Sequence, residues 1–240
     1  MTLRIAMFSG PRNISTAMMR SWENRSDTDV VDEPYYANFL ETTGFDHPGR
    51  SETLASQSSD ADQVGRALCG PSPNGSAVWY QKHMTHHLRE GMDLGWMKSV
   101  LACFLIRQPD EMLASLHAKT PCPTVDDTGL PRQVQLFDQA MIDGVPPVID
   151  AREVLERPRE MLGALCDRIG IPFEDAMLSW PAGPRDTDGA WAPYWYDSVW
   201  KSTGFQPWAP RSIDLPASLR PVLEECERCY EHLHRHRITV

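Results

Sequence analysis

The chain has 240 residues, of which 41% are hydrophobic, so it can bury a full core, and its length fits one α/β domain over residues 1–240. Its formal net charge of −10 opposes sequence-independent binding to nucleic acid or to an anionic membrane, because both depend on many Lys and Arg side chains. The six cysteines follow no framework spacing, no apolar run approaches the ~20 residues of a membrane span, and a strand pattern begins directly after Met-Thr-Leu-Arg. We therefore expect reduced thiols, no signal peptide and a cytoplasmic location.

Short apolar runs alternate with helical patterns along the chain. Strands are predicted over residues 3–8, 29–32, 77–81, 100–106 and 147–150. Helices are predicted over residues 15–24, 60–68, 110–118, 132–142, 152–169 and 217–233. This alternation predicts a mostly parallel central sheet of about five strands flanked by helices on both faces. In such sheets ligands bind beyond the carboxyl ends of the strands.

Three segments have a different composition. Residues 42–59 and 119–131 are rich in Gly, Pro, Ser, Thr and Asp, and are predicted to be loops or short insertions on the ligand-binding side. Residues 181–210 carry seven Trp, Tyr and Phe side chains between Trp191 and Trp208. We expect this aromatic segment to be a lid or a substrate segment, or to pack in the core.

The first predicted strand ends in Ser9-Gly10-Pro11-Arg12-Asn13-Ile14-Ser15-Thr16, which leads directly into a helix. Such a junction directs free backbone N–H groups and the positive end of the helix dipole at one point, which suits a phosphate or sulfate group. It is not a Walker A loop, because Ser15, Thr16 and Ala17 stand where that pattern needs Gly-Lys-Ser/Thr. The cation comes early, at Arg12.

A second candidate anion site follows the fourth predicted strand. Arg107 leaves that strand at its carboxyl end, where a guanidinium can bind a phosphate with two hydrogen bonds. Ser115 lies on the helix that follows and can donate to the same anion. Two anion sites on neighbouring strand–helix junctions suit a ligand with phosphoryl groups at both ends of a nucleoside.

Both elements resemble motifs of the P-loop sulfotransferases that use 3′-phosphoadenosine 5′-phosphosulfate. Residues 11–16 look like the family's 5′-phosphosulfate loop, and Arg107, Pro109 and Ser115 resemble its R-x-P-x5-S element for the 3′-phosphate. Residues 148–173, ending in Gly-Ile-Pro-Phe, resemble its later strand, helix and turn. The likeness is to the bacterial sulfotransferase-like branch. It implies a three-layer sandwich like that of P-loop nucleoside triphosphate hydrolases.

The resemblance also implies the reaction, which is transfer of a sulfuryl group to a small-molecule hydroxyl or amine without a metal. The residues implied to bind the donor are Pro11, Arg12, Asn13, Ile14, Ser15, Thr16, Arg107 and Ser115. The chain departs from the family at Ile14, where many members carry Gly, and in lacking a convincing C-terminal Arg-Lys-Gly triplet. Lys201, or Arg185 with Gly189, is the candidate substitute for that triplet.

Two side chains at strand ends are candidates for the base that takes the acceptor's proton. His83 lies in a Lys-His sequence that resembles the Lys-Thr-His segment of cytosolic sulfotransferases, although Lys82 and His83 are adjacent here and would face opposite sides of a continuing strand. Glu33 follows the second strand, where several bacterial members carry a carboxylate. Arg12 and Lys82 are the candidate oxyanion stabilisers, and the sequence leaves the choice of base open.

The acceptor pocket and several alternatives stay less defined. His47, Arg50 and Trp191 are candidate substrate contacts from the loops and the aromatic segment. The histidines at 83, 86 and 87, and the cluster of Cys226, Cys229 and nearby histidines, lack the further ligands of a convincing metal site. A P-loop-type kinase, a pyridoxal phosphate enzyme and a nucleotide-binding module without turnover are the rival functions. Nothing in the sequence supports an oligomer.

Overall fold

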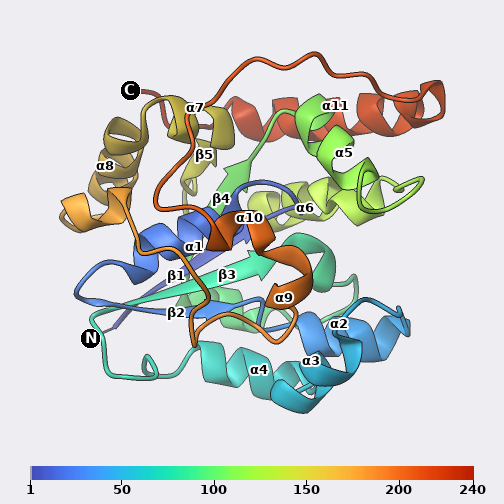
Figure 1. Cartoon of the computed structure of the whole chain (residues 1–240). Helices are drawn as coiled ribbons and strands as arrows, with labels where there is room; N and C mark the ends of the chain where they lie inside the picture. Colours follow the sequence, from blue (N-terminus) through green and yellow to red (C-terminus); the bar gives the residue numbers. More distant parts are fainter. Residues whose placement is uncertain (1) are drawn as a thin grey trace.

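The computed structural model describes residues 2–240 and contains one five-stranded parallel sheet (Figure 1). The strands are β1 (Leu3–Ser9), β2 (Thr28–Asp32), β3 (Val78–Met84), β4 (Leu101–Ile106) and β5 (Val148–Asp150). They lie in the order β2-β3-β1-β4-β5, and every neighbouring pair is parallel. The predicted α/β fold is therefore confirmed. Because β1 is central, its carboxyl end opens between those of β3 and β4.

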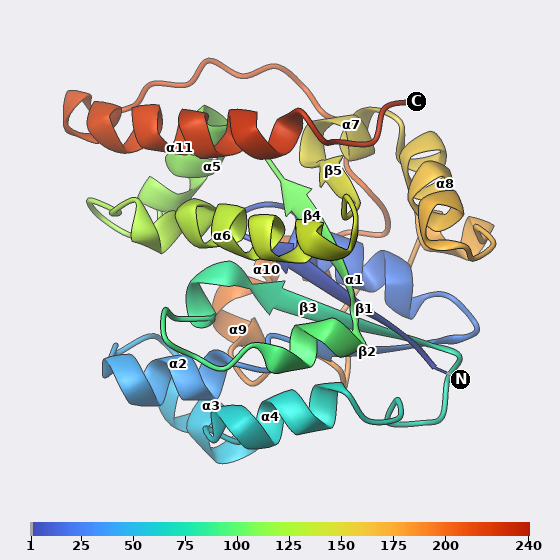
Figure 2. The same ribbon diagram turned by 180° about the vertical axis from the view of Figure 1, so that it is seen from behind.

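Helices cover both faces of the sheet. One face packs against α1 (Ser15–Glu23), α7 (Ala151–Glu156) and α8 (Pro158–Ile169) through a core that includes Met18, Trp22 and Leu165. The other face packs against α4 (Ala61–Leu68), α5 (Pro109–His117), α6 (Leu130–Ala140) and α11 (Arg220–His234). Figure 2 shows α6 and α11 side by side on this second face. The sheet is thus the middle of three layers.

The remaining helices are short. The α-helices among them are α2 (Tyr36–Thr43), α3 (Arg50–Ser56), α9 (Ala192–Trp195) and α10 (Asp197–Trp200). Single 3₁₀ turns lie at η1 (Thr85–His87), η2 (Gly95–Ser99), η3 (Asp126–Thr128), η4 (Met141–Asp143), η5 (Asp175–Leu178) and η6 (Ala217–Leu219). Among the described residues, no helix is long and apolar enough to cross a membrane.

Three local predictions are corrected. The predicted loop 42–59 contains the short helix α3, which packing stabilises. Thr53 is buried, and Leu54 packs against a buried cluster that includes Tyr36, Phe39 and Trp191. Helix α2 was missed because its Tyr, Asn, Phe and Thr residues have low helix propensity and burial stabilises it instead. The single helix predicted over 152–169 is two, α7 and α8, because Pro158 cannot continue a helix and starts a new one.

A buried ion pair fixes the aromatic segment to helix α1. Asp188 accepts from the guanidinium of Arg20 on α1 at 2.6–2.7 Å and from the indole of Trp200 at 2.9 Å. Further along the segment, Trp191 and Tyr196 pack against Tyr36 and Phe39 of α2. Residues 185–200 therefore lie against α1 and α2 beside the carboxyl ends of the strands, as Figure 1 shows for α9 and α10.

Candidate functional site

The loop between β1 and α1 is held in an unusual backbone conformation. Arg12 and Ile14 have φ angles of 62° and 55°, in the left-handed region where Gly is favoured. Ile14 is also the N-cap residue of α1. At Gly10 an added Cβ would lie 2.3 Å from the carbonyl oxygen of Thr128, so the loop packs directly on the backbone beside α6. The conformation at position 14 gives a physical reason for the Gly that many family members carry there.

The side chains of this loop divide into buried and accessible groups. Asn13 and Ser15 are buried, with the Asn13 amide 3.5 Å from the carbonyl of Leu105 and the Ser15 hydroxyl against the sulfur of Met84. Pro11, Arg12 and Thr16 are half-buried. Ser15 begins α1, so the free N–H groups of the first helical turn lie directly behind the loop. The loop thus presents backbone donors together with the Arg12 cation.

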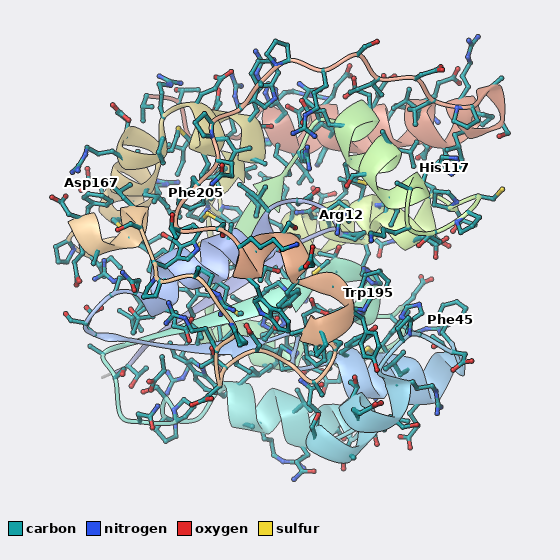
Figure 3. All side chains as sticks on the ribbon, in the orientation of Figure 1. Arg12, Phe45, His117, Asp167, Trp195 and Phe205 are labelled. Atoms are coloured by element: carbon teal, nitrogen blue, oxygen red, sulfur yellow. The ribbon has the colours of Figure 1, made fainter. Side chains whose placement is uncertain are left out.

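The two predicted anion elements meet in space. Arg12 Nε donates to Ser115 Oγ at 2.9 Å, and Arg107 Nη1 donates to the backbone carbonyl of Arg12 at 2.7 Å. Burial and the nearby Arg107 charge both lower the pKa of Arg12. Two guanidinium groups that repel each other at one sheet edge form a favourable environment for a polyanion. Figure 3 shows Arg12 beside α5, the helix that carries Ser115.

Arg107 also has an internal counterion. Its Nε and Nη2 donate to Glu111 Oε2 at 3.0 and 2.9 Å. The other oxygen of Glu111 accepts from the indole N–H of Trp208 at 2.8 Å, and the guanidinium of Arg152 stacks 3.9 Å from the centre of the same indole. The segment between α10 and α11, which runs past α7 in Figure 1, is thereby tied to the Arg107 element.

A buried group of four polar side chains lies at the carboxyl ends of β2 and β3. Asp32 and Lys82 are paired in register, and the Lys82 ammonium donates to Asp32 Oδ1 at 2.8 Å, to Glu33 Oε1 and to Tyr196 Oη at 2.9 Å. Tyr196 comes from the aromatic segment, 114 residues after Lys82. Glu33 has a φ angle of 42°, which turns the chain out of β2 at this point. We call Asp32, Glu33, Lys82 and Tyr196 the carboxylate cluster.

Burial and charge set the protonation of this cluster. Burial raises the pKa of Glu33, the Lys82 ammonium opposes that rise, and the neighbouring Asp32 adds to it. Burial alone would discharge Lys82, but Asp32 and Glu33 hold its pKa well above its ordinary value. The cluster therefore contains a stable ammonium and a carboxyl group with raised proton affinity, which is the property of a general base that works near neutral pH.

His83 lies on the other face of β3. The strand continues to Met84, so Lys82 and His83 point to opposite sides, as the sequence predicts for a continuing strand. The His83 ring is 1% exposed and packs 5.1 Å from the rings of both Phe8 and Trp96. Burial and the Lys82 charge lower its pKa to about 3. Its imidazole is thus uncharged and enclosed by aromatic rings.

Three further histidines pack with Tyr36 and Phe39 beside Glu33, and we call Tyr36, Phe39, His47, His86 and His87 the aromatic wall. His87 stacks on Tyr36 with ring centres 4.5 Å apart, and its Nδ1 lies 3.9 Å from Glu33 Oε2. Burial lowers the pKa of His86 to about 4 and holds that of His87 well below its ordinary value. Within residues 2–240, no group of three His, Cys, Asp or Glu side chains could hold a metal ion.

The predicted acceptor contacts are distributed around this wall. His47 Nδ1 lies 2.9 Å from the Tyr36 hydroxyl, and Trp191 is buried with its indole N–H 3.2 Å from Tyr196 Oη. Arg50 is half-buried at the start of α3. His47 and Trp191 therefore adjoin the same Tyr36 and Tyr196 side chains that surround Glu33.

The candidate substitutes for the missing triplet lie in separate places. Lys201 is exposed and paired with Asp197 at 2.8 Å, and Arg185 lies 3.8 Å from Glu23 on α1. The backbone N–H of Gly189 donates to Asp32 Oδ2 at 3.2 Å, so it joins the carboxylate cluster instead. None of these contacts connects them to Arg107.

Sequence reasoning missed three residues of this site. Asp32 precedes Glu33 directly, and its position at a strand end was the signal that could have identified it. Tyr196 gave no such signal, because its role depends on a contact with a residue 164 positions away. Glu111 lies in the predicted helix 110–118, four residues after Arg107, and this spacing of opposite charges was the signal that could have identified it.

A comparison with protein families finds a match that covers most of the chain. A family described as "Sulfotransferase domain" matches residues 3–225. Two curated relatives from Arabidopsis thaliana, branched-chain-amino-acid aminotransferase-like proteins 1 and 2, are 38% and 35% identical over 234 and 233 residues. These alignments cover 97% of this chain but only 42% and 41% of the relatives, so the chain spans about two fifths of their length.

Solved structures with the same fold are sulfotransferase domains. That of the Synechococcus PCC 7002 olefin synthase has a TM-score of 0.61 at 18% identity, covering 96% of this chain and 95% of its own. That of the curacin biosynthetic pathway has a TM-score of 0.56 at 15% identity, covering 98% of each chain. A sulfotransferase from Alicyclobacillus acidocaldarius has a TM-score of 0.54 at 12% identity, covering 100% and 98%.

Proposed function

The chain belongs to the sulfotransferase domain family, and we propose that it transfers a sulfuryl group from 3′-phosphoadenosine 5′-phosphosulfate to a hydroxyl or amine of a small molecule. The observation that carries this proposal is the convergence of Arg12, Arg107 and Ser115 at the carboxyl ends of β1 and β4. A donor with phosphoryl groups at two positions of one nucleoside would give each guanidinium an anionic partner.

The residues at hand fit such a donor. The loop at positions 11–16 would hold the 5′-phosphosulfate end through the first N–H groups of α1 and the Arg12 guanidinium. Arg107 and Ser115 would hold the 3′-phosphate, with Lys201 as a further candidate cation from the tail. The donor supplies the sulfuryl group, and this chemistry needs no metal ion.

Glu33 is our proposed base. It lies at the end of β2, its pKa is raised by burial, and its side chain is 11% exposed, whereas that of Asp32 is 1% exposed. In this role Glu33 removes the acceptor's proton as the acceptor's lone pair forms the new bond to sulfur. His83 is the second candidate, but its ring faces Phe8 and Trp96 on the other side of the sheet.

Arg12 and Lys82 are the proposed stabilisers of developing negative charge. Arg12 adjoins the loop, and Lys82 shares its ammonium between the two carboxylates. When Glu33 gains a proton, its hold on the ammonium weakens, and the positive field of Lys82 becomes available to the reacting oxygens. The aromatic wall with His47 and Trp191, together with Arg50, is the proposed acceptor side of the site.

The names of the Arabidopsis relatives suggest a different chemistry, and the relatives are much longer than this chain. Pyridoxal phosphate enzymes need a lysine whose uncharged amine forms a Schiff base. Among residues 2–240, Lys82 is the only buried lysine, and Asp32 and Glu33 hold it as an ammonium. These contacts favour sulfuryl transfer over aminotransferase chemistry for this chain.

Titration calorimetry tests the donor assignment. We expect 3′-phosphoadenosine 5′-phosphate to bind without metal, more tightly than ATP with Mg²⁺, and we expect Arg107→Ala to abolish that binding. Arg228→Ala is the matched control, because Arg228 is exposed and pairs only with Glu225 on its own helix. A preference for ATP with Mg²⁺ would overturn the sulfotransferase proposal in favour of a P-loop-type kinase.

A further inference from the structure

The carboxylate cluster holds two acids around one ammonium, and its hydrogen bonds treat the two acids differently. Asp32 accepts three hydrogen bonds: Oδ1 from Lys82 at 2.8 Å, and Oδ2 from the Tyr196 hydroxyl at 2.7 Å and the Gly189 N–H at 3.2 Å. Both Asp32 oxygens are therefore satisfied as a carboxylate. All three donors point at the carboxylate oxygens of Asp32 and stabilise their negative charge.

The direction of the Tyr196 hydroxyl follows from its other contacts. Its oxygen accepts from the Lys82 ammonium at 2.9 Å and from the Trp191 indole at 3.2 Å. Only one proton remains for it to donate, with Asp32 at 2.7 Å and Glu33 at 3.5 Å as the choices. The shorter contact takes it, so Tyr196 donates to Asp32 and not to Glu33.

Glu33 is left with one free oxygen. Its Oε1 accepts from Lys82, but no described residue among 2–240 donates a hydrogen bond to its Oε2. Oε2 lies 3.9 Å from His87 Nδ1, which belongs to the aromatic wall of the proposed acceptor side. The groups that face Glu33 are Asp32 on β2, Lys82 on β3, Tyr36 on α2, His87 on η1 and Tyr196 after α9.

We propose that Asp32 and Tyr196 are positioning residues that reserve Glu33 Oε2 for the acceptor's proton. Tyr196 and Gly189 occupy Oδ2 of Asp32, Asp32 holds the Lys82 ammonium in place, and Glu33 Oε2 is the carboxylate oxygen left to take the proton. In the step itself the acceptor's O–H or N–H bond breaks and an O–H bond forms at Oε2. This inference rests on the proposed role of Glu33 as the base.

The inference predicts opposite effects for two conservative variants. Asp32→Asn removes the negative charge that raises the proton affinity of Glu33, so the pKa of Glu33 should fall. Tyr196→Phe removes the hydroxyl donor that stabilises the negative charge of the cluster, so the pKa of Glu33 should rise. A merely structural role would change the melting temperature of each variant without moving the pKa values in opposite directions.

Carbon-13 NMR titration of the Asp and Glu carboxyl groups measures these values without an acceptor. Glu33→Gln assigns the Glu33 signal. Tyr194→Phe is the control, because Tyr194 lies on α9 two residues before Tyr196 and is 48% exposed. We expect the titration midpoint of Glu33 to move down by about one pH unit or more in Asp32→Asn, up in Tyr196→Phe and not at all in the control. Equal or absent shifts in the two variants overturn the inference.

The same samples separate this inference from the proposed function. Binding of 3′-phosphoadenosine 5′-phosphate to the unmodified protein tests the function alone. If the nucleotide binds but the midpoints do not move as stated, the positioning roles fail and the function stands. If the midpoints move but the nucleotide does not bind, the sulfotransferase proposal fails while the hydrogen-bond hierarchy of the cluster stands. Once an acceptor is known, the acidic limb of the pH profile of kcat should move to lower pH in Asp32→Asn and to higher pH in Tyr196→Phe.

Discussion

Arg12 donates a hydrogen bond to Ser115 across 2.9 Å of space and 103 residues of chain. This contact joins the loop after β1 to the helix after β4, so the two ends of the proposed donor site form one unit. Arg107 strengthens the connection by donating to the carbonyl of Arg12. A change in either element is therefore expected to affect binding at both ends of a nucleotide.

Ser115→Ala is expected to weaken binding of 3′-phosphoadenosine 5′-phosphate about tenfold. The variant removes a hydroxyl that contacts one guanidinium and, in our proposal, the 3′-phosphate, and hydrogen bonds to charged groups contribute roughly 1.5–3 kcal/mol. Calorimetry checks the change, with Ser99→Ala as the control, because Ser99 is exposed. An unchanged Kd for Ser115→Ala would contradict the placement of the 3′-phosphate.

Glu111→Gln is expected to tighten binding of the same nucleotide several-fold. In the present structure Glu111 neutralises Arg107, so a phosphate must compete with this carboxylate for the guanidinium. Gln keeps an oxygen for the indole of Trp208 and loses the charge. Glu225→Gln, which breaks the exposed pair with Arg228, is the control. Weaker binding would show that Glu111 supports the nucleotide site instead of competing with it.

Glu33→Gln is expected to raise the melting temperature at pH 8 and to lower turnover by about 10²–10⁴ once an acceptor is known. Because burial raises the pKa of Glu33 in the folded state, the wild-type protein loses stability as the pH rises through that value, and Gln avoids the loss. Below the ordinary pKa of Glu the two proteins should melt alike.

Thermal melts at pH 4 and pH 8 measure this difference, with the exposed Glu41→Gln as the comparison. For a chain of this size, about 1 kcal/mol appears as roughly 2–4 °C in Tm. A lower Tm at pH 8 in Glu33→Gln would mean that the second carboxylate stabilises Lys82 more than its own burial costs.

Gly10→Ala is expected to destabilise the fold by roughly 1–3 kcal/mol, because its Cβ would overlap the backbone carbonyl of Thr128, which cannot move independently of α6. Gly163→Ala is the counterpart inside α8. It has open space around the new methyl group and should stabilise the helix by about 0.5–1 kcal/mol. Urea unfolding of both variants checks the two signs. Equal effects would contradict the close packing of the loop.

The sequence predicted the sheet well because buried parallel strands are short, nearly continuous apolar runs. Leu3–Ser9 and Leu101–Ile106 show this pattern directly, and the turn after each carries the residues that we propose bind the donor's anionic groups. Helices α2 and α3 were not predicted, since tertiary contacts such as those of Phe39 with His86 and His87 stabilise them rather than propensity.

The carboxylate cluster could be predicted only in part. Glu33 and Lys82 stand at strand ends, so the rule that ligands bind beyond the carboxyl ends of parallel strands identifies them. The pairing register that places Asp32 opposite Lys82 is a property of the assembled sheet. Tyr196 reaches the cluster from a segment without a regular period. The ion pair of Asp188 with Arg20 helps to decide which residues of the aromatic segment face inward, and this pair is a three-dimensional contact that the sequence does not display.

Asp188 and Tyr196 are synthesised long after Arg20 and Asp32, the residues that they contact, so the cluster can be enclosed only late in synthesis. Asp32, Glu33 and Lys82 leave the ribosome well before the residues that enclose them, so water must solvate these charges on the nascent chain. All five strands precede residue 151, which allows the sheet to assemble first. A translation product that stops at residue 180 would thus contain every strand and still lack Tyr196, which encloses Asp32 and Lys82.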